Sequence, residues 1–258
     1  MNTTSFVPFL IASPLDQFAI NCLVPFRLGP VDLSFTNSSL FLIVGTGLVS
    51  ILMLFATVKG GRLVPSLWQS IVEMVYDFIY DMVQNQVGPG GRPYFPFIFA
   101  IFVFILAANL IGMIPYSFTS TSHIVVTFGL SVSIFVGVTL IGIMTHGLHF
   151  LSFFLPGGAP LALAPLLVVL EVVSYSFRAI SLGVRLFANM MAGHTLVKIL
   201  SGFAWTMLSV GGILAVGALG PFLVVFALTG LELGVASLQA YVFTVLTCIY
   251  LNDAIHLH

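Results

Sequence analysis

Residues 166–200 read LLVVLEVVSYSFRAISLGVRLFANMMAGHTLVKIL, and residues 221–252 read PFLVVFALTGLELGVASLQAYVFTVLTCIYLN. No proline interrupts either stretch after its first residue, so each predicts one continuous helix. At about 1.5 Å per residue these helices are roughly 50 Å long, whereas the hydrocarbon core of a bilayer is about 30 Å thick. Because both stretches end in apolar residues, we expect a hairpin of two long, strongly tilted membrane helices, beyond the usual tilt of about 20°.

The composition of the chain indicates a membrane protein throughout. Of 258 residues, 59% are hydrophobic and only 6% are charged, whereas an average soluble domain carries about 25% charged residues. Residues 93–170 contain no Lys, Arg, Asp or Glu, and a spanning helix needs roughly 20 apolar residues. The few scattered basic residues exclude a nucleic-acid surface. Two distant cysteines, Cys22 and Cys248, exclude a disulfide framework.

The remaining apolar stretches complete one all-α polytopic membrane domain over residues 1–258. Trp205 to Gly220, with two adjacent glycines, is the expected turn region of the hairpin. The elements expected, in chain order, are a first span at about 40–58, an amphipathic helix at about 65–87, spans at about 95–113 and 124–148, and long tilted helices at about 166–200 and 221–252.

The loop after the first span carries three of the seven basic residues, Lys59, Arg62 and Arg92. By the positive-inside rule this loop faces the cytoplasm-like side, which is the matrix in a mitochondrion, and the N-terminus lies on the opposite side. Within the loop, the amphipathic helix carries three acidic residues at i, i+4 steps. Its acidic face is either solvated or a docking surface for a basic partner such as a stalk subunit; these residues are Glu73, Asp77 and Asp81.

Charged side chains within the two long helices need partners or a task, because each costs at least about 2.5 kcal/mol at a helix centre. They recur in seven-residue steps, which drift only about 20° and so keep to one helix face. The first helix carries Glu171, Arg178 and Arg185 at this spacing, and the second carries Glu232, Gln239, Leu246 and Asp253.

An antiparallel hairpin brings these two faces together. If Glu171 lies level with Asp253, then Arg185 meets Gln239, and Glu232 falls within a turn of His194. Carboxylates and imidazole exchange protons near neutral pH when they are buried, but an arginine essentially never releases its proton. The spacing therefore predicts two separate proton-exchange sites with Arg185 as the barrier between them.

Plainer interpretations remain open for the other polar groups. Arg178 fits a structural ion pair with Glu171, Lys198 fits a side chain that reaches the interface, and Asp253 fits an aqueous terminus. Asn109 and Asn189 fit amides that pack helices together. We expect no metal site, cofactor or catalytic group. The rival function is a secondary proton-coupled transporter, which predicts inverted repeats and broken helices. A third possible function is a purely structural subunit of a respiratory complex.

Four segments together closely resemble subunit a of rotary F-type ATP synthases, of the mitochondrial kind found in fungi and plants. The resemblance reaches over nearly the whole chain, and motifs of this length are specific. The segments are Ser181 to His194, Leu231 to Phe243, Tyr250 to Ala254 and Asn109 to Phe118.

The resemblance implies a function for particular residues. Arg185 matches the essential arginine that faces a carboxylate of the rotating c-ring. The implied intermembrane-space half-channel contains Glu232, His194, Gln239, Asn189 and Asn109, and the implied matrix half-channel contains Glu171 and Asp253, with Arg178 in a supporting role.

The resemblance also implies a setting. The chain is expected to be a non-catalytic, proton-translocating stator subunit in the mitochondrial inner membrane, with its N-terminus in the intermembrane space and its C-terminus on the matrix side. The two long helices lie nearly in the membrane plane in that family. The implied partners are the c-ring subunits, peripheral-stalk subunit b, small membrane subunits of the synthase and the lipid bilayer, with protons as the transported ion.

Overall fold

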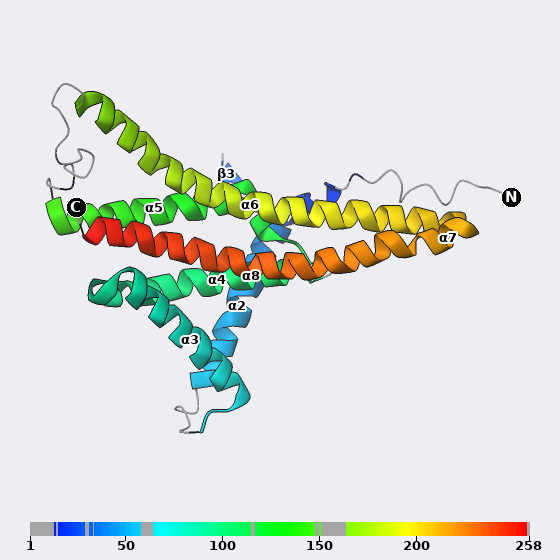
Figure 1. The fold of residues 1–258 in the computed structure, drawn as a ribbon, viewed down its shortest axis with the longest axis horizontal. Coiled ribbons are helices and arrows are strands. Elements are labelled where there is room, and N and C mark those ends of the chain that lie inside the picture. Colours follow the sequence, from blue (N-terminus) through cyan, green and yellow to red (C-terminus); the bar gives the residue numbers. More distant parts are fainter. Residues whose placement is uncertain are drawn as a thin grey trace.

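A computed structural model describes residues 13, 15–28, 31–32, 34–57, 64–114, 117–147, 150 and 164–256. Within these ranges, five helical segments are long and apolar enough to cross a membrane, which confirms the all-α polytopic fold class. The α-helices are α2 (Asn37–Thr57), α3 (Leu67–Gln86), α4 (Phe95–Gly112), α5 (Ile124–His146), α6 (Ala164–Val210), α7 (Ile213–Gly217) and α8 (Leu219–Ile255) (Figure 1).

Short elements lie before and between these helices. Two antiparallel strand pairs precede α2, and the sequence did not predict them because strands of two or three residues show no period-two pattern. The strands are β1 (Cys22–Val24) paired with β4 (Phe35–Thr36), and β2 (Arg27–Leu28) paired with β3 (Val31–Asp32). The 3₁₀ turns are η1 (Asp16–Phe18), η2 (Gly88–Tyr94) and η3 (Ser120–Ser122).

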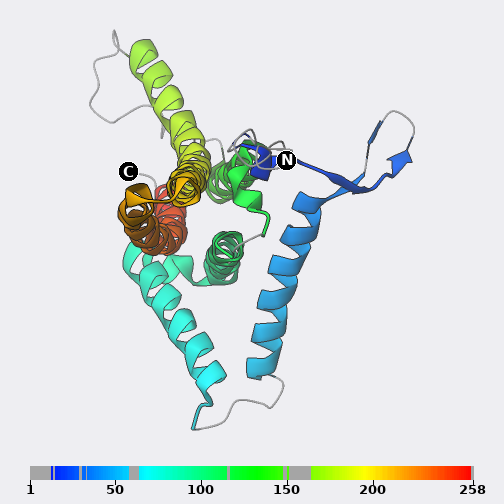
Figure 2. The same cartoon turned by 90° about the vertical axis from the view of Figure 1, so that its right-hand side faces the viewer.

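Four helices form a bundle along the long axis of the molecule. Helices α4, α5, α8 and most of α6 lie side by side, and α2 runs across their direction (Figures 1 and 2). The buried apolar core comes from these four helices and from the C-terminal half of α3. At the start of α3, the Ser66 side chain accepts a hydrogen bond from the Gln69 backbone N–H. Within the described residues, α2 contributes nothing to this core cluster, and it packs against α4 at the side of the bundle (Figure 2). The helices α4 and α5 therefore follow the long hairpin and not the direction of α2.

The long hairpin is longer, and its turn tighter, than the sequence predicted. Helix α6 has 47 residues and α8 has 37, which correspond to about 70 Å and about 55 Å. The expected turn region from Trp205 to Gly220 is largely helical, because α6 continues to Val210 through residues that include no proline, and α7 and the start of α8 follow. The chain reverses at Gly211 and Gly212, whose φ angles of 75° and 63° require glycine.

The register of the hairpin also differs from the predicted one. Arg178 contacts Asp253, whereas the predicted register places it level with Leu246. Gln239 bonds to Asn189, whereas the predicted register places it opposite Arg185. The first pair is offset from the predicted register by seven residues and the second by four, so the two helices are shifted by about one to two turns. Residues one turn apart share a helix face, so the seven-residue spacing is compatible with either register, and a long side chain such as Arg178 leans toward the N-terminus of its helix.

Several residues singled out in the sequence fall outside the described residues. These are the basic residues Lys59 and Arg62 in the loop after α2, and His149 after α5. His123 and His146 lie at the two ends of α5, and Cys248 is a fully buried core residue of α8.

Candidate functional site

The polar side chains of the hairpin fall into three groups along its length. One group lies near the start of α6 and the end of α8, one consists of Arg185 in the middle, and one lies near His194. At about 1.5 Å per residue, Arg185 is about 10 Å along α6 from Arg178 and about 13 Å from His194. A hydrogen bond spans only about 3 Å. One small group therefore cannot bond at the same time to Arg185 and to either of these neighbours.

The first group is an ion-pair cluster around Arg178. Its Nη1 lies 3.0 Å from Asp253 Oδ2, and its Nη2 lies 4.0 Å from Glu171 Oε1. The guanidinium also lies over the ring of Tyr250, at 5.9 Å from the centroid, where cation–π attraction adds to the cluster. The structure confirms the pairing of Arg178 with Glu171, and it replaces the aqueous-terminus interpretation of Asp253 with a specific partner.

Arg185 differs from Arg178 in every respect that the structure shows. Its side chain is exposed on the outer face of α6, and it makes no hydrogen bond or ion pair with any described residue. The flanking residues Leu182 and Leu186 are 2% and 0% exposed and face the bundle. The helix therefore directs Arg185 away from its own protein.

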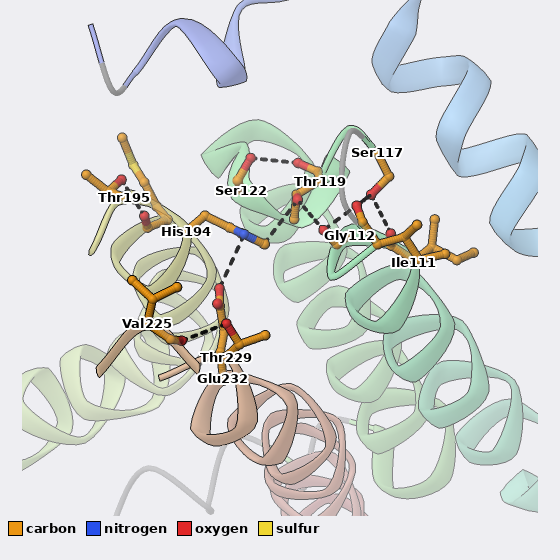
Figure 3. A network of polar contacts seen from close by, with 12 residues as sticks. Ile111, Gly112, Ser117, Thr119, Ser122, His194, Thr195, Val225, Thr229 and Glu232 are labelled. Atoms are coloured by element: carbon orange, nitrogen blue, oxygen red, sulfur yellow. Dashed lines mark hydrogen bonds and ion pairs between the residues drawn. The ribbon is translucent and has the colours of Figure 1, made fainter. Parts of the chain in front are cut away.

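The third group is a pair formed by His194 and Glu232. The imidazole Nδ1 lies 3.3 Å from Glu232 Oε1, and Glu232 is only 5% exposed. Gly193 makes this approach possible, since a Cβ at that position would lie 2.7 Å from the same carboxylate oxygen. Figure 3 shows the imidazole between Glu232 and a third group, Thr119, whose Oγ1 lies 3.2 Å from Nε2. The predicted pair is confirmed.

Three amides lie between Arg185 and this pair. Asn189 Nδ2 donates to Gln239 Oε1 at 3.0 Å, which joins the two long helices. Asn109 is fully buried, and its Nδ2 donates to the Ala236 carbonyl at 3.2 Å, which joins α4 to α8. The structure therefore brings together all five residues that the resemblance assigns to one path, as two side-chain pairs and one amide bonded to the α8 backbone.

Thr119 is the site residue that the sequence did not predict. The Ser/Thr-rich segment before α5 carries no spacing signal that places it over α6, and only the packing of η3 against α6 does so. The one available signal was the run of hydroxyl residues itself, in an otherwise apolar region.

Comparison with known proteins identifies the family. The sequence profile described as ATP synthase A chain matches residues 39–252. ATP synthase subunit a of Marchantia polymorpha is 62% identical over 96% of this chain and 100% of its own length. The protein of the same name in Oenothera berteroana is 60% identical over 95% of this chain and 90% of its own length, and that of Chondrus crispus is 54% identical over 97% and 98%.

The chain belongs to the ATP synthase subunit a family.

Membership of the subunit a family fixes the general function. Subunit a is the proton-conducting stator subunit of the membrane sector of ATP synthase, and the identity to its members extends over nearly the whole chain. The three polar groups of the hairpin lie within the matched residues, apart from Asp253, which follows the last of them. The alternative of a secondary transporter has no support from these comparisons.

Proposed function

We propose that this chain provides two offset half-channels for protons, and that Arg185 separates them where they meet a rotating ring of c subunits. The observation that carries the proposal is that Arg185 is exposed and has no partner among the residues of its own chain that the structure describes. An unpaired charge within a membrane is costly. Its counter-charge must therefore come from another subunit, and a ring carboxylate has the right charge and chemistry.

The intermembrane-space half-channel consists of the His194–Glu232 pair, the Asn189–Gln239 pair and Asn109. Imidazole and buried carboxylate groups take up and release protons near neutral pH. The contact between them supports transfer of a proton from one to the other. The amides continue this polar line along the hairpin toward Arg185.

The matrix half-channel contains Glu171 and Asp253, with Arg178 supporting both. The two carboxylates approach one guanidinium from different helices, which holds acceptor groups for a departing proton at one end of the hairpin. The ion pairs also support a structural duty for Arg178, since it keeps the ends of α6 and α8 in contact.

The mechanism follows from what an arginine is able to do. A proton enters beside Glu232 and neutralises a ring carboxylate, which then turns into lipid; after almost a full revolution the proton leaves through the matrix half-channel. The ionised carboxylate next passes Arg185. Because a guanidinium does not release its proton, it blocks direct leakage between the half-channels. Each charge that crosses is worth about 2.3 kcal/mol per 100 mV.

The proposed setting is the mitochondrial inner membrane. If α2 crosses the bilayer, then the four helices that run across its direction lie strongly tilted toward the membrane plane (Figures 1 and 2). The N-terminus then faces the intermembrane space and the C-terminus the matrix. Further proposed partners are subunit b of the peripheral stalk and small membrane subunits of the synthase. Apart from taking up and releasing protons, the chain carries out no chemical reaction.

A secondary transporter is the less favoured function. Such transporters bind their cargo at helices that are broken near the middle of the membrane. Here α6 and α8 are continuous through every charged residue of the hairpin, from Glu171 to Lys198 and from Glu232 to Asp253.

A cysteine crosslink to the ring tests the proposed function. Ala188 is exposed and lies three residues from Arg185, on the same face of α6. In the assembled synthase, Ala188→Cys is expected to crosslink to a cysteine placed one turn from the carboxylate of subunit c. Leu186→Cys is the matched control, because Leu186 is fully buried toward the bundle. Absence of the Ala188 crosslink, or equal crosslinking from both positions, contradicts the proposal.

A further inference from the structure

The connection between α4 and α5 contains a cluster of buried hydroxyl groups. Thr119 is 5% exposed, and the three residues of η3 that follow it are each 3% exposed. Buried hydroxyls in a membrane protein need hydrogen-bond partners. One of these, Ser122, donates its Oγ hydrogen to the Thr119 carbonyl at 2.6 Å, and the nearby, half-buried Ser117 donates its Oγ hydrogen to the Ile114 carbonyl at 2.7 Å.

Thr119 alone among them contacts the His194–Glu232 pair. Its Oγ1 lies 3.2 Å from His194 Nε2 and also 3.2 Å from the Gly112 carbonyl at the end of α4 (Figure 3). The backbone leaves room for this arrangement only with glycine at position 112. A Cβ there would lie 2.7 Å from Thr119 Cγ2 and 2.9 Å from Oγ1. Thr119 is therefore held in a site that fits it closely.

The hydrogens of Thr119 and of the His194 imidazole, which approaches Glu232 Oε1 at 3.3 Å, can be placed in two ways. A threonine hydroxyl has one hydrogen to donate, and a neutral imidazole has one N–H and one acceptor nitrogen. When Glu232 is ionised, Nδ1–H faces the carboxylate, and Nε2 accepts the Thr119 hydrogen. When Glu232 is protonated, its O–H faces Nδ1, Nε2–H donates to Thr119 Oγ1, and the Thr119 hydrogen turns to the Gly112 carbonyl.

We propose that Thr119 is a positioning residue of the proton path, which holds His194 in the correct tautomer for each protonation state of Glu232. This inference rests on the proposed half-channel. The Gly112 carbonyl is the second acceptor that allows the hydroxyl to serve both states. Thr119 keeps its own proton throughout, because only the direction of its O–H changes.

One proton passes for each change of state. The Thr119 O–H first turns to the Gly112 carbonyl, which frees the lone pair of Nε2. A proton binds there, the Nδ1–H bond breaks, and the proton from Nδ1 forms the O–H bond of Glu232. The imidazole is neutral before and after, and the carboxylate becomes a carboxylic acid. After Glu232 releases the proton toward the ring, the imidazole gives its Nε2 proton to water in the half-channel and takes one from water at Nδ1, with no net gain or loss of protons, and Thr119 then donates to Nε2 again.

Substitutions in the assembled synthase test this role. Thr119→Val keeps the shape and removes the hydroxyl, and it is expected to lower ATP-driven proton pumping and ATP synthesis in membrane vesicles by about tenfold, since misplacement of a reacting group is costly. Thr119→Ser is expected to restore most of the rate. Thr121→Val is the matched control, because Thr121 is equally buried and its Oγ1 bonds to no described residue.

The outcomes separate this inference from the half-channel itself. Full coupled pumping in Thr119→Val overturns the positioning role, as does an equal loss in Thr121→Val or a failure of Thr119→Ser to restore the rate. A Glu232→Gln variant is measured in the same vesicles. If it remains active, the half-channel assignment fails; if it is inactive while Thr119→Val is active, only the role of Thr119 fails.

Discussion

Replacing Arg185 with alanine is expected to abolish both ATP synthesis and ATP-driven proton pumping, while the synthase still assembles. Assembly is expected to survive because the Arg185 side chain is exposed and bonds to no described residue of its own chain. Coupling is expected to fail because nothing else on the hairpin separates the two proton-exchange groups. Vesicle assays of synthesis and of fluorescence-detected pumping measure the loss, and native electrophoresis measures assembly.

A matched control for this variant lies on the same helix face. Ser181 is also exposed, four residues before Arg185, and Ser181→Ala is expected to keep both activities near the wild-type level. Coupled pumping that persists in the Arg185→Ala synthase contradicts the barrier role. A complex that does not assemble in that variant contradicts the structural basis of the prediction, because the side chain would then have a partner that holds the subunit in place.

Replacing Glu232 with glutamine is expected to have the next largest effect. Glutamine keeps the size of the buried side chain but has no acidic proton to exchange with His194. Positioned proton-transfer groups contribute about 100-fold or more to rates, so we expect proton-driven ATP synthesis to fall by about that factor. The rate of synthesis under an imposed proton gradient is the measurement.

The control for Glu232 is an exposed residue of the same helix. Ser237 bonds only to the Leu233 carbonyl of its own helix, at 3.2 Å, and Ser237→Ala is expected to leave synthesis unchanged. If Glu232→Gln synthesises ATP at the wild-type rate, the proton does not pass through this carboxylate, and the intermembrane-space half-channel must be assigned to other groups.

The sequence predicted those parts of the site that depend on spacing along a single helix. The seven-residue steps placed Arg185 between two acidic groups, and the antiparallel hairpin then required Glu232 to meet His194. These predictions succeeded because helical periodicity is a local property. The absence of proline within both stretches, also a local property, supported the expectation of two uninterrupted long helices.

The sequence could not predict the features that depend on packing between elements. A shift of about one to two turns keeps the same faces in contact, so the pairing of Arg178 with Asp253 appeared only in the structure. Thr119 reaches His194 because the α4–α5 connection folds over α6, and no pattern within that connection encodes this placement. The exposure of Arg185, which carries the functional proposal, likewise depends on which face of α6 the bundle covers.

The central claim is that the partner of Arg185 belongs to another subunit, and a structure of the assembled synthase in its membrane sector tests it most directly. The decisive measurement is the distance from the Arg185 guanidinium to the nearest carboxylate of the c-ring. We predict an approach within about 4 Å, the range of an ion pair, in at least one rotational state. An Arg185 side chain that instead pairs with a carboxylate of its own chain, or faces only lipid in every state, would contradict the account.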